Sequence, residues 1–167
     1  MISPIYGENY NLHYGFASFK DKSILDLGAD HGSSVDFFFK HGAKYIVAVE
    51  GDHDLFLKLS YNFNTNPNVL CIENMIKSSH AFIDLLESYN PDLVKIDIEG
   101  DEKYLLDIPT DLISKINEWL IETHTVELFD KFTKLFTSLE YKLSFHYRHV
   151  FPTNQIDVIW ARKEPLF

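Results

Sequence analysis

Residues 23–50 read SILDLGADHGSSVDFFFKHGAKYIVAVE, in which two short apolar runs, Ser23 to Leu27 and Tyr45 to Glu50, flank a segment of helical length. Within that segment Val35 and Phe38 recur at helical spacing. Strand, helix and strand in this order form the unit from which parallel sheets are built. Both runs are largely apolar, as strands covered by helices on both faces must be. The stretch therefore predicts an α/β fold.

The same alternation continues along the chain. Further apolar runs are Val69 to Glu73, Asp92 to Ile98 and Trp119 to Thr123, each followed by a segment with helical spacing. The segment after Ile98 is predicted to be helical from about residue 101 to 117, with a break at Pro109. The last helix is predicted to begin near Val126.

The C-terminal part changes to strand alternation from Leu143, then the turn-like FPTNQ at residues 151–155, then an apolar run from Ile156 to Arg162. This pattern predicts a closing β-hairpin. Residues 1–167 are therefore predicted to form a single domain with a doubly wound, Rossmann-like sheet of about seven strands, mostly parallel, with a C-terminal antiparallel hairpin. Residues 1–20 form a lead-in, in which Tyr6, Tyr10 and Tyr14 either cover an acceptor as a lid or simply pack on the domain.

Composition limits the class of partner. The chain has 167 residues, of which 15 are Lys or Arg and 25 are Asp or Glu, so its net charge of −10 disfavours nucleic acid as a partner. The single cysteine, Cys71, excludes an internal disulfide, and the first residues lack a signal-peptide pattern, which predicts a cytoplasmic protein. No apolar run approaches the ~18 residues that cross a bilayer, so no membrane association is predicted.

Polar residues follow the first strand, where parallel sheets bind ligands. The loop contains Asp26, Gly28, Asp30 and Gly32, and Ser33 or Ser34 is expected to cap the next helix. Glycines at these positions allow positive φ and let a ligand approach the backbone. The sequence predicts a nucleotide-type binding loop.

Asp30 selects among nucleotide ligands. It occupies the position at which a dinucleotide fingerprint has its second glycine, and a carboxylate there repels a pyrophosphate. This argues against a nicotinamide-dependent oxidoreductase and favours a cationic ligand without phosphate, S-adenosylmethionine. Glu50, at the end of the second strand, is placed to accept hydrogen bonds from ribose hydroxyls.

The motifs DLGADHG, IVAVEGD, KIDIEGDE and IETH resemble those of the FkbM-like group of class I S-adenosylmethionine-dependent methyltransferases, over about residues 23–125. The resemblance implies methylation of a hydroxyl on a small acceptor such as a sugar or polyketide, with Glu73 or Asn74 beside the adenine. The family often has Asn in place of Asp30 and Pro in place of Gly51. The predicted donor site comprises Asp26, Gly28, Asp30, Gly32, Ser33, Glu50, Gly51, Glu73, Asn74 and Asp97.

Three residues at the ends of the fourth and fifth strands are the predicted catalytic group: Asp97, Glu99 and His124. His124 is expected to act as general base or acceptor ligand, because the ordinary pKa of histidine, ~6.5, suits proton removal near neutrality. Asp97 is expected nearer the methionine portion of the donor. Asp101 and Glu102 are interpreted as part of a solvated helix start.

Asp97, Glu99, Glu122 and His124 also carry atoms that bind metals. Along one strand only alternate residues share a face, so Asp97 can pair with Glu99, or Glu122 with His124. A bound metal is not predicted.

Other functions remain open at this stage. The chain could be a binding module that holds the donor without turnover, or a scaffold subunit. A homodimer neighbour could supply cover for the acceptor, since few residues precede the first strand. An RNA methyltransferase would need a basic patch, and the Asn-Pro-Pro-aromatic signature of base methylation is missing after the fourth strand.

Overall fold

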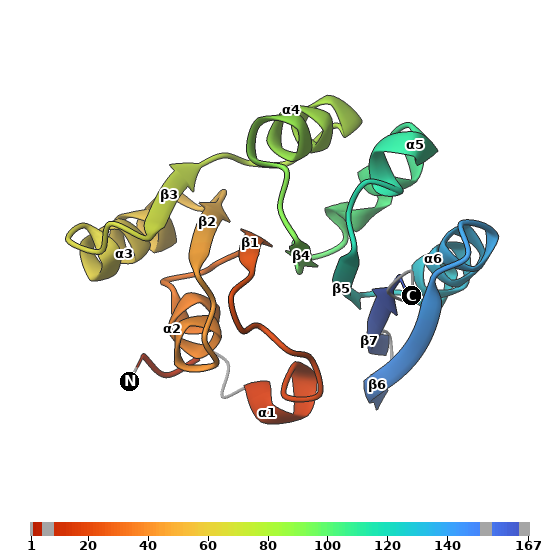
Figure 1. Cartoon of the computed structure of the whole chain (residues 1–167), viewed down its shortest axis with the longest axis horizontal. Helices are drawn as coiled ribbons and strands as arrows, with labels where there is room; N and C mark the ends of the chain where they lie inside the picture. Colours follow the sequence, from red (N-terminus) through yellow and green to blue (C-terminus); the bar gives the residue numbers. More distant parts are fainter. Residues whose placement is uncertain (1, 5–8, 151–154, 164–167) are drawn as a thin grey trace.

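The computed structural model describes residues 2–4, 9–150 and 155–163, which form a seven-stranded sheet in the order β3-β2-β1-β4-β5-β7-β6 (Figure 1). The strands are β1 (Ser23–Leu27), β2 (Tyr45–Glu50), β3 (Val69–Glu73), β4 (Leu93–Ile96), β5 (Glu118–Thr123), β6 (Lys142–Val150) and β7 (Gln155–Arg162). The first five pair in parallel, and β7 runs antiparallel to both β5 and β6. The predicted fold class is confirmed. Residues 151–154 of the predicted turn lie outside the described residues.

Helices cover both faces of the sheet. One face carries α1 (Tyr10–His13), α2 (Ser33–Lys40) and α3 (His53–Phe63). The other carries α4 (Ser79–Tyr89), the 3₁₀ helix η1 (Asp101–Asp107), α5 (Thr110–Ile113) and α6 (Val126–Ser138). Within the described ranges, none of these helices has both the length and the apolar character needed to span a bilayer.

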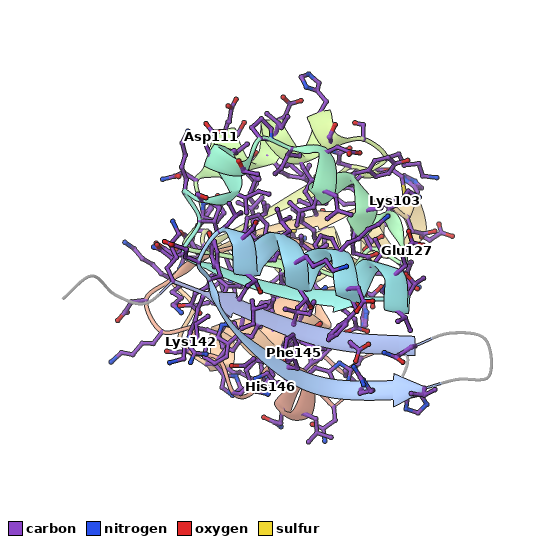
Figure 2. The ribbon with its side chains drawn as sticks, turned by 90° about the vertical axis from the view of Figure 1, so that its right-hand side faces the viewer. Lys103, Asp111, Glu127, Lys142, Phe145 and His146 are labelled. Atoms are coloured by element: carbon purple, nitrogen blue, oxygen red, sulfur yellow. The ribbon has the colours of Figure 1, made fainter. Side chains whose placement is uncertain are left out.

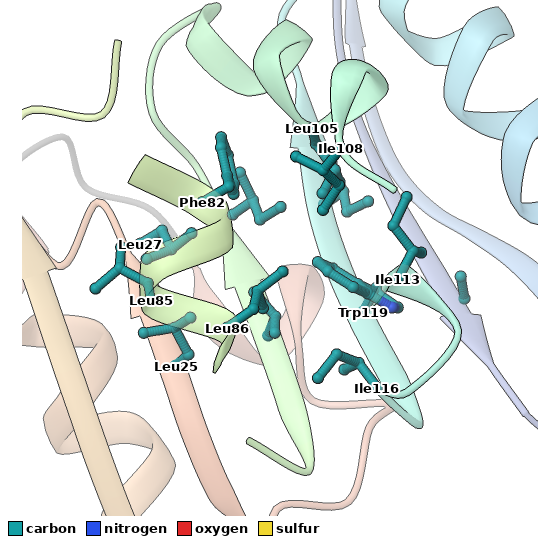
Figure 3. Close-up of a cluster of buried hydrophobic side chains, with 14 of the residues drawn as sticks. Leu25, Leu27, Phe82, Leu85, Leu86, Leu105, Ile108, Ile113, Ile116 and Trp119 are labelled. Carbon is teal, nitrogen blue, oxygen red and sulfur yellow. The ribbon is translucent and has the colours of Figure 1, made fainter. Parts of the chain in front are cut away.

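The pleat of the strands divides the core into two layers, because successive side chains point to opposite faces. Leu25 and Leu27 of β1 belong to the layer that contains Phe82 of α4 and Trp119 of β5 (Figure 3). Ile24 belongs to the opposite layer. Both layers are buried, which explains why most positions of the parallel strands are apolar.

The C-terminal hairpin extends the sheet beyond β5. Figure 2 shows α6 alongside β6 and β7, and the rings of Phe129 on α6 and Phe145 on β6 have their centroids 5.2 Å apart. The helix predicted over about residues 101–117 forms instead as η1 and α5, with Pro109 between them as the N-cap of α5. The predicted break is confirmed, since proline cannot donate the backbone hydrogen bond that a continuous helix requires.

The order of the strands changes direction at β1. β1 pairs with β2 on one side and with β4 on the other, so strand order reverses at β1. In open α/β sheets ligands bind outside the carboxyl ends of the strands at such a point. The fold therefore directs attention to the loops that follow β1, β2, β3 and β4.

Candidate functional site

A pocket of about 370 Å³ lies over the carboxyl ends of β1 to β4. This volume is within the range of small-molecule sites, ~300 to 1,000 Å³. Its lining residues are Gly28, Asp30, Val49, Glu50, Gly51, Asp52, Leu55, Asn74, Met75, Ile76, Lys77, Asp97, Ile98, Glu99 and Asp101. The pocket is thus rich in carboxylates. Its apolar part includes Leu55 of α3 and, after β3, Met75 and Ile76.

Most of the predicted donor-site residues line this pocket: Gly28, Asp30, Glu50, Gly51, Asn74 and Asp97. Of the two adenine candidates, Asn74 lines the pocket. Glu73 does not, because its exposed carboxylate accepts a hydrogen bond from His53 Nδ1 at 2.8 Å. Asp26, Gly32 and Ser33 do not line the pocket either.

Asp26 is part of the interior. It has no exposed surface, and its Oδ1 lies 3.2 Å from Lys95 Nζ while its Oδ2 accepts a hydrogen bond from Ser34 Oγ at 2.5 Å. Asp26 and Lys95 are register partners across β1 and β4, which places them side by side. Burial raises the pKa of Asp26, and the charge of Lys95 opposes that shift. Asp26 therefore holds β1 to β4 and does not face the ligand pocket.

Gly28 and Gly32 have the predicted positive φ, 80° and 99°. The space beside them is filled by protein, however. A Cβ on Gly28 would lie 1.7 Å from the backbone oxygen of Asp97, and one on Gly32 would lie 2.2 Å from the ring of Phe63. Glycine is therefore required at both positions for backbone conformation and for close packing against the protein itself.

The predicted serine cap is wrong. Gly32 is the N-cap of α2 and has no side chain to donate or accept a bond. Ser34 contacts Asp26, as described above, and Ser33 Oγ lies 2.8 Å from Tyr10 OH. Tyr14 is buried in the core against Phe38, with ring centroids 5.9 Å apart, so it packs as the simpler interpretation predicted and is not a lid. Tyr6 lies outside the described residues.

Glu50 occupies the predicted position at the end of β2, with its carboxylate at the pocket wall. Its Oε2 accepts a hydrogen bond from the Asp30 amide and its Oε1 accepts one from the Asp52 amide, each at 2.8 Å. A carboxylate oxygen can accept two hydrogen bonds, so each oxygen retains acceptor capacity. The two loops thus fix the orientation of Glu50 while leaving it able to bind a further donor.

Sequence reasoning missed the apolar part of the pocket. Leu55, Met75 and Ile76 line it, together with Lys77. The available signal was position, because residues 75–77 continue the loop that begins with the predicted Asn74 at the carboxyl end of a strand.

Beside the pocket, acidic residues surround His124. His124 Nε2 lies 3.7 Å from Asp97 Oδ1 and 3.6 Å from Glu99 Oε2. On the other side of the ring, Nδ1 lies 2.9 Å from Glu102 Oε1. Asp97, Glu99 and His124 thus lie close together beside the pocket. Glu102, expected in a solvated helix start, is instead fully buried beneath the ring.

The surroundings of His124 change its expected chemistry. Burial lowers the pKa of His124, but the hydrogen bond to Glu102 and the charges of Glu102, Asp97 and Glu99 raise it to about 9. The imidazole is therefore protonated at neutral pH, unlike a histidine with the ordinary value. In this state it can donate a hydrogen bond, which favours the expected role of acceptor ligand over that of general base.

Comparisons with known proteins bear on the fold and the family. No protein-family model matches the chain. The chain is 31% identical over 122 residues to Uncharacterized protein 65 of Sulfolobus islandicus filamentous virus (isolate Iceland/Hveragerdi), covering 71% of this chain and 70% of that protein.

Several solved structures share the fold. Precorrin-6y C5,15-methyltransferase from Geobacter metallireducens GS-15 superposes with a TM-score of 0.61 at 18% identity, over 86% of this chain and 81% of that one. Ribosomal protein L11 methylase from Lactobacillus delbrueckii subsp. bulgaricus gives 0.59 at 19%, over 90% and 74%. The M1A22 tRNA methyltransferase TrmK of B. subtilis gives 0.63 at 13%, over 89% and 63%. The chain therefore has the Rossmann-like fold seen in these methyltransferases.

Proposed function

The chain belongs to the same protein family as Uncharacterized protein 65 of Sulfolobus islandicus filamentous virus, and since that name assigns no activity, we propose from the pocket that it binds S-adenosylmethionine and methylates a hydroxyl of a small acceptor. The observation that carries the proposal is the acid-lined pocket at the strand-order reversal, with Glu50 at its wall. The methyltransferase folds named above support the same donor.

The residues of the pocket fit this donor. The carboxylates of Asp30 and Asp97 favour a ligand with a sulfonium and an ammonium group over one with phosphates. Glu50 has acceptor capacity for ribose hydroxyls. Met75 and Ile76 provide apolar contact for a purine ring beside Asn74. The backbone of the β1 loop closes the pocket at Gly28.

When bound, S-adenosylmethionine supplies a methyl group whose bond to sulfur breaks as a bond to the acceptor oxygen forms and the hydroxyl proton leaves. The chain contributes position, which supplies up to ~7 to 11 kcal/mol in well-oriented reactions. Asp97 and Glu99 line the pocket, and His124 lies 3.7 Å from Asp97, so we assign the acceptor to this end of the pocket. Protonated His124 is suited to hold an acceptor oxygen by donating a hydrogen bond.

For the acceptor we favour a small molecule, as in the FkbM-like group that the motifs resemble. The pocket carries six carboxylates, Asp30, Glu50, Asp52, Asp97, Glu99 and Asp101, against one basic residue, Lys77. Such a surface repels a phosphate backbone. TrmK acts on tRNA by its name, so RNA is the acceptor to be tested against the small molecule.

Donor binding is tested by calorimetry with S-adenosylhomocysteine. Wild type is expected to bind, and Glu50→Gln is expected to bind at least ~10-fold more weakly, because a hydrogen bond to a charged group contributes ~1.5 to 3 kcal/mol. Glu73→Gln is the matched control, since Glu73 pairs with Glu50 in the β2–β3 register but lies outside the pocket. No binding by wild type at millimolar ligand contradicts the proposal, as does equal binding by both variants.

Acceptor class is tested by transfer of labelled methyl groups from S-adenosylmethionine to a cell extract separated into small metabolites and RNA. Label is expected in the metabolite fraction, and base hydrolysis should not release it, because methyl ethers resist base whereas methyl esters do not. Label in RNA alone would replace the small-molecule acceptor by RNA. Tight donor binding with transfer to neither fraction would identify a binding module without turnover.

A further inference from the structure

Asp97, Glu122 and His124 come together at the ends of two neighbouring parallel strands. Asp97 follows β4, Glu122 belongs to β5, and His124 directly follows β5. Each residue offers one ligand atom, and these atoms all lie within 4.8 Å of one another. In octahedral coordination with ligand atoms ~2.1 Å from the ion, two neighbouring ligand atoms are ~3.0 Å apart and two on opposite sides of the ion are ~4.2 Å apart. Shifts of less than about 1 Å would therefore bring the three atoms onto a common ion.

Glu122 supplies an independent indication of a cation. Only 4% of the residue is exposed, and its Oε2 accepts no hydrogen bond from any residue that the structure describes. His13 Nδ1 of α1 lies 3.5 Å from this oxygen. A buried carboxylate is costly unless it is paired or coordinates a metal, and this one faces a second carboxylate.

Glu102 orients the histidine as an outer partner of a metal ligand does. It has no exposed surface, and its Oε1 accepts hydrogen bonds from the amides of Ile98 and Gly100, each at 3.1 Å. The same oxygen lies 2.9 Å from His124 Nδ1, which therefore donates to it and leaves Nε2 directed at Asp97. Histidines that bind metals usually donate their other ring N–H to a carboxylate in this way.

We propose that Asp97, Glu122 and His124 bind a divalent cation of the Mn²⁺ type beside the pocket, with the cation displacing the proton of His124 Nε2. Two carboxylates with one imidazole combine the oxygen ligands that Mn²⁺ and Mg²⁺ prefer with a nitrogen that favours a transition metal. Three protein ligands leave coordination positions open, and Glu99 Oε2, 3.6 Å from His124 Nε2, is near enough to fill one. The three ligands come from two neighbouring strands, so the alternation of side chains along one strand does not keep them apart.

The cation would also complete the acceptor side of the proposed methyltransferase, and this role rests on the proposed function. A hydroxyl bound to a divalent cation loses its proton more easily, because the positive charge stabilises the resulting alkoxide. The hydroxyl proton would then pass to solvent or a neighbouring carboxylate. A metal-activated hydroxyl thus needs no neutral histidine as base. Binding of the cation itself requires neither donor nor acceptor.

The test is electron paramagnetic resonance of Mn²⁺ added to the metal-stripped, full-length protein without methyl donor. Wild type is expected to bind one Mn²⁺ per chain and to show nitrogen coupling from a coordinated imidazole in pulsed spectra. His124→Ala should lose that coupling, and Glu122→Gln and Asp97→Asn should each weaken binding at least ~100-fold, more than the ~10- to 100-fold typical of losing an outer partner. Asp97 is partly exposed in the pocket, so its variant is the least demanding for folding.

The matched control is a second carboxylate–histidine pair, Glu73 with His53, which is exposed and lies 2.8 Å apart outside the pocket. Glu73→Gln and His53→Ala should bind Mn²⁺ as wild type does. The proposal is overturned if wild type binds no Mn²⁺ at millimolar concentration, if bound Mn²⁺ shows no nitrogen coupling, or if Asp97→Asn binds unchanged. Mn²⁺ binding without S-adenosylhomocysteine binding would remove the proposed methyl donor and keep the metal site. Binding of S-adenosylhomocysteine without binding of Mn²⁺ would keep the proposed methyl donor and overturn the proposed metal site.

Discussion

Lys95→Met is expected to lower the free energy of unfolding by about 3 to 5 kcal/mol, the usual cost of removing one partner of a buried ion pair. Lys95 is 2% exposed, and its Nζ lies 3.2 Å from Asp26 Oδ1 and donates to the Gly28 carbonyl at 2.6 Å. Burial by itself lowers the pKa of Lys95, but Asp26 and Asp97 raise it well above the ordinary value, so the ammonium is charged. Methionine would leave Asp26 without its cation.

Urea unfolding followed by circular dichroism measures this change. Lys103→Met is the matched control, since Lys103 also pairs with an aspartate, Asp101 at 3.0 Å, but is more than half exposed. It should change stability by less than about 1 kcal/mol. Adding Asp26→Asn to Lys95→Met should recover part of the loss, because asparagine is uncharged and can still accept the hydrogen bond from Ser34. A loss below ~1 kcal/mol in Lys95→Met would show that the pair does not support the fold.

Gly28→Ala is expected to cost about 3 kcal/mol or more, because two separate penalties add. The φ of Gly28 is +80°, a region that disfavours any side chain, and a Cβ there would lie 1.7 Å from the Asp97 backbone oxygen. Backbone cannot yield as a flexible side chain can, so β4 must move away from β1. That movement would displace Asp97 from the pocket, and binding of S-adenosylhomocysteine should be lost as well.

Gly100→Ala separates the two penalties. Its φ is +97°, but a Cβ there would meet nothing within 4 Å. This control should cost only the conformational term, about 1 to 2 kcal/mol. Both variants are measured by urea unfolding, and equal losses would mean that the contact between Gly28 and Asp97 contributes nothing.

Much of the candidate site was predictable because it depends on position along a strand. Glu50, Asn74 and Asp97 were assigned to the pocket since each stands at or just beyond the carboxyl end of a parallel strand, and all three line it. The fate of Asp26 was not predictable from position alone. It lies in the same motif as Asp30, but its register partner is Lys95, and a register between distant strands cannot be read from the motif.

The acceptor side shows the same limit. The motifs KIDIEGDE and IETH predict catalytic residues at the ends of two strands. The sequence places Glu102 at a solvated helix start, whereas in the structure it is the buried partner of His124. As a result the pKa of His124 is raised to about 9, above the ordinary value of histidine on which its expected role as a base depends.

The order of apolar runs and helical stripes by itself determined the class of sheet, its parallel strands and its closing hairpin, because burial on one or two faces imposes its period directly on the chain. The tertiary structure decided which acids face the pocket, which are paired inside, and that Asp97, Glu122 and His124 meet. Those outcomes depend on how separate strands are aligned beside one another and on what lies beneath them, since charge interactions are set by distance in space rather than along the chain.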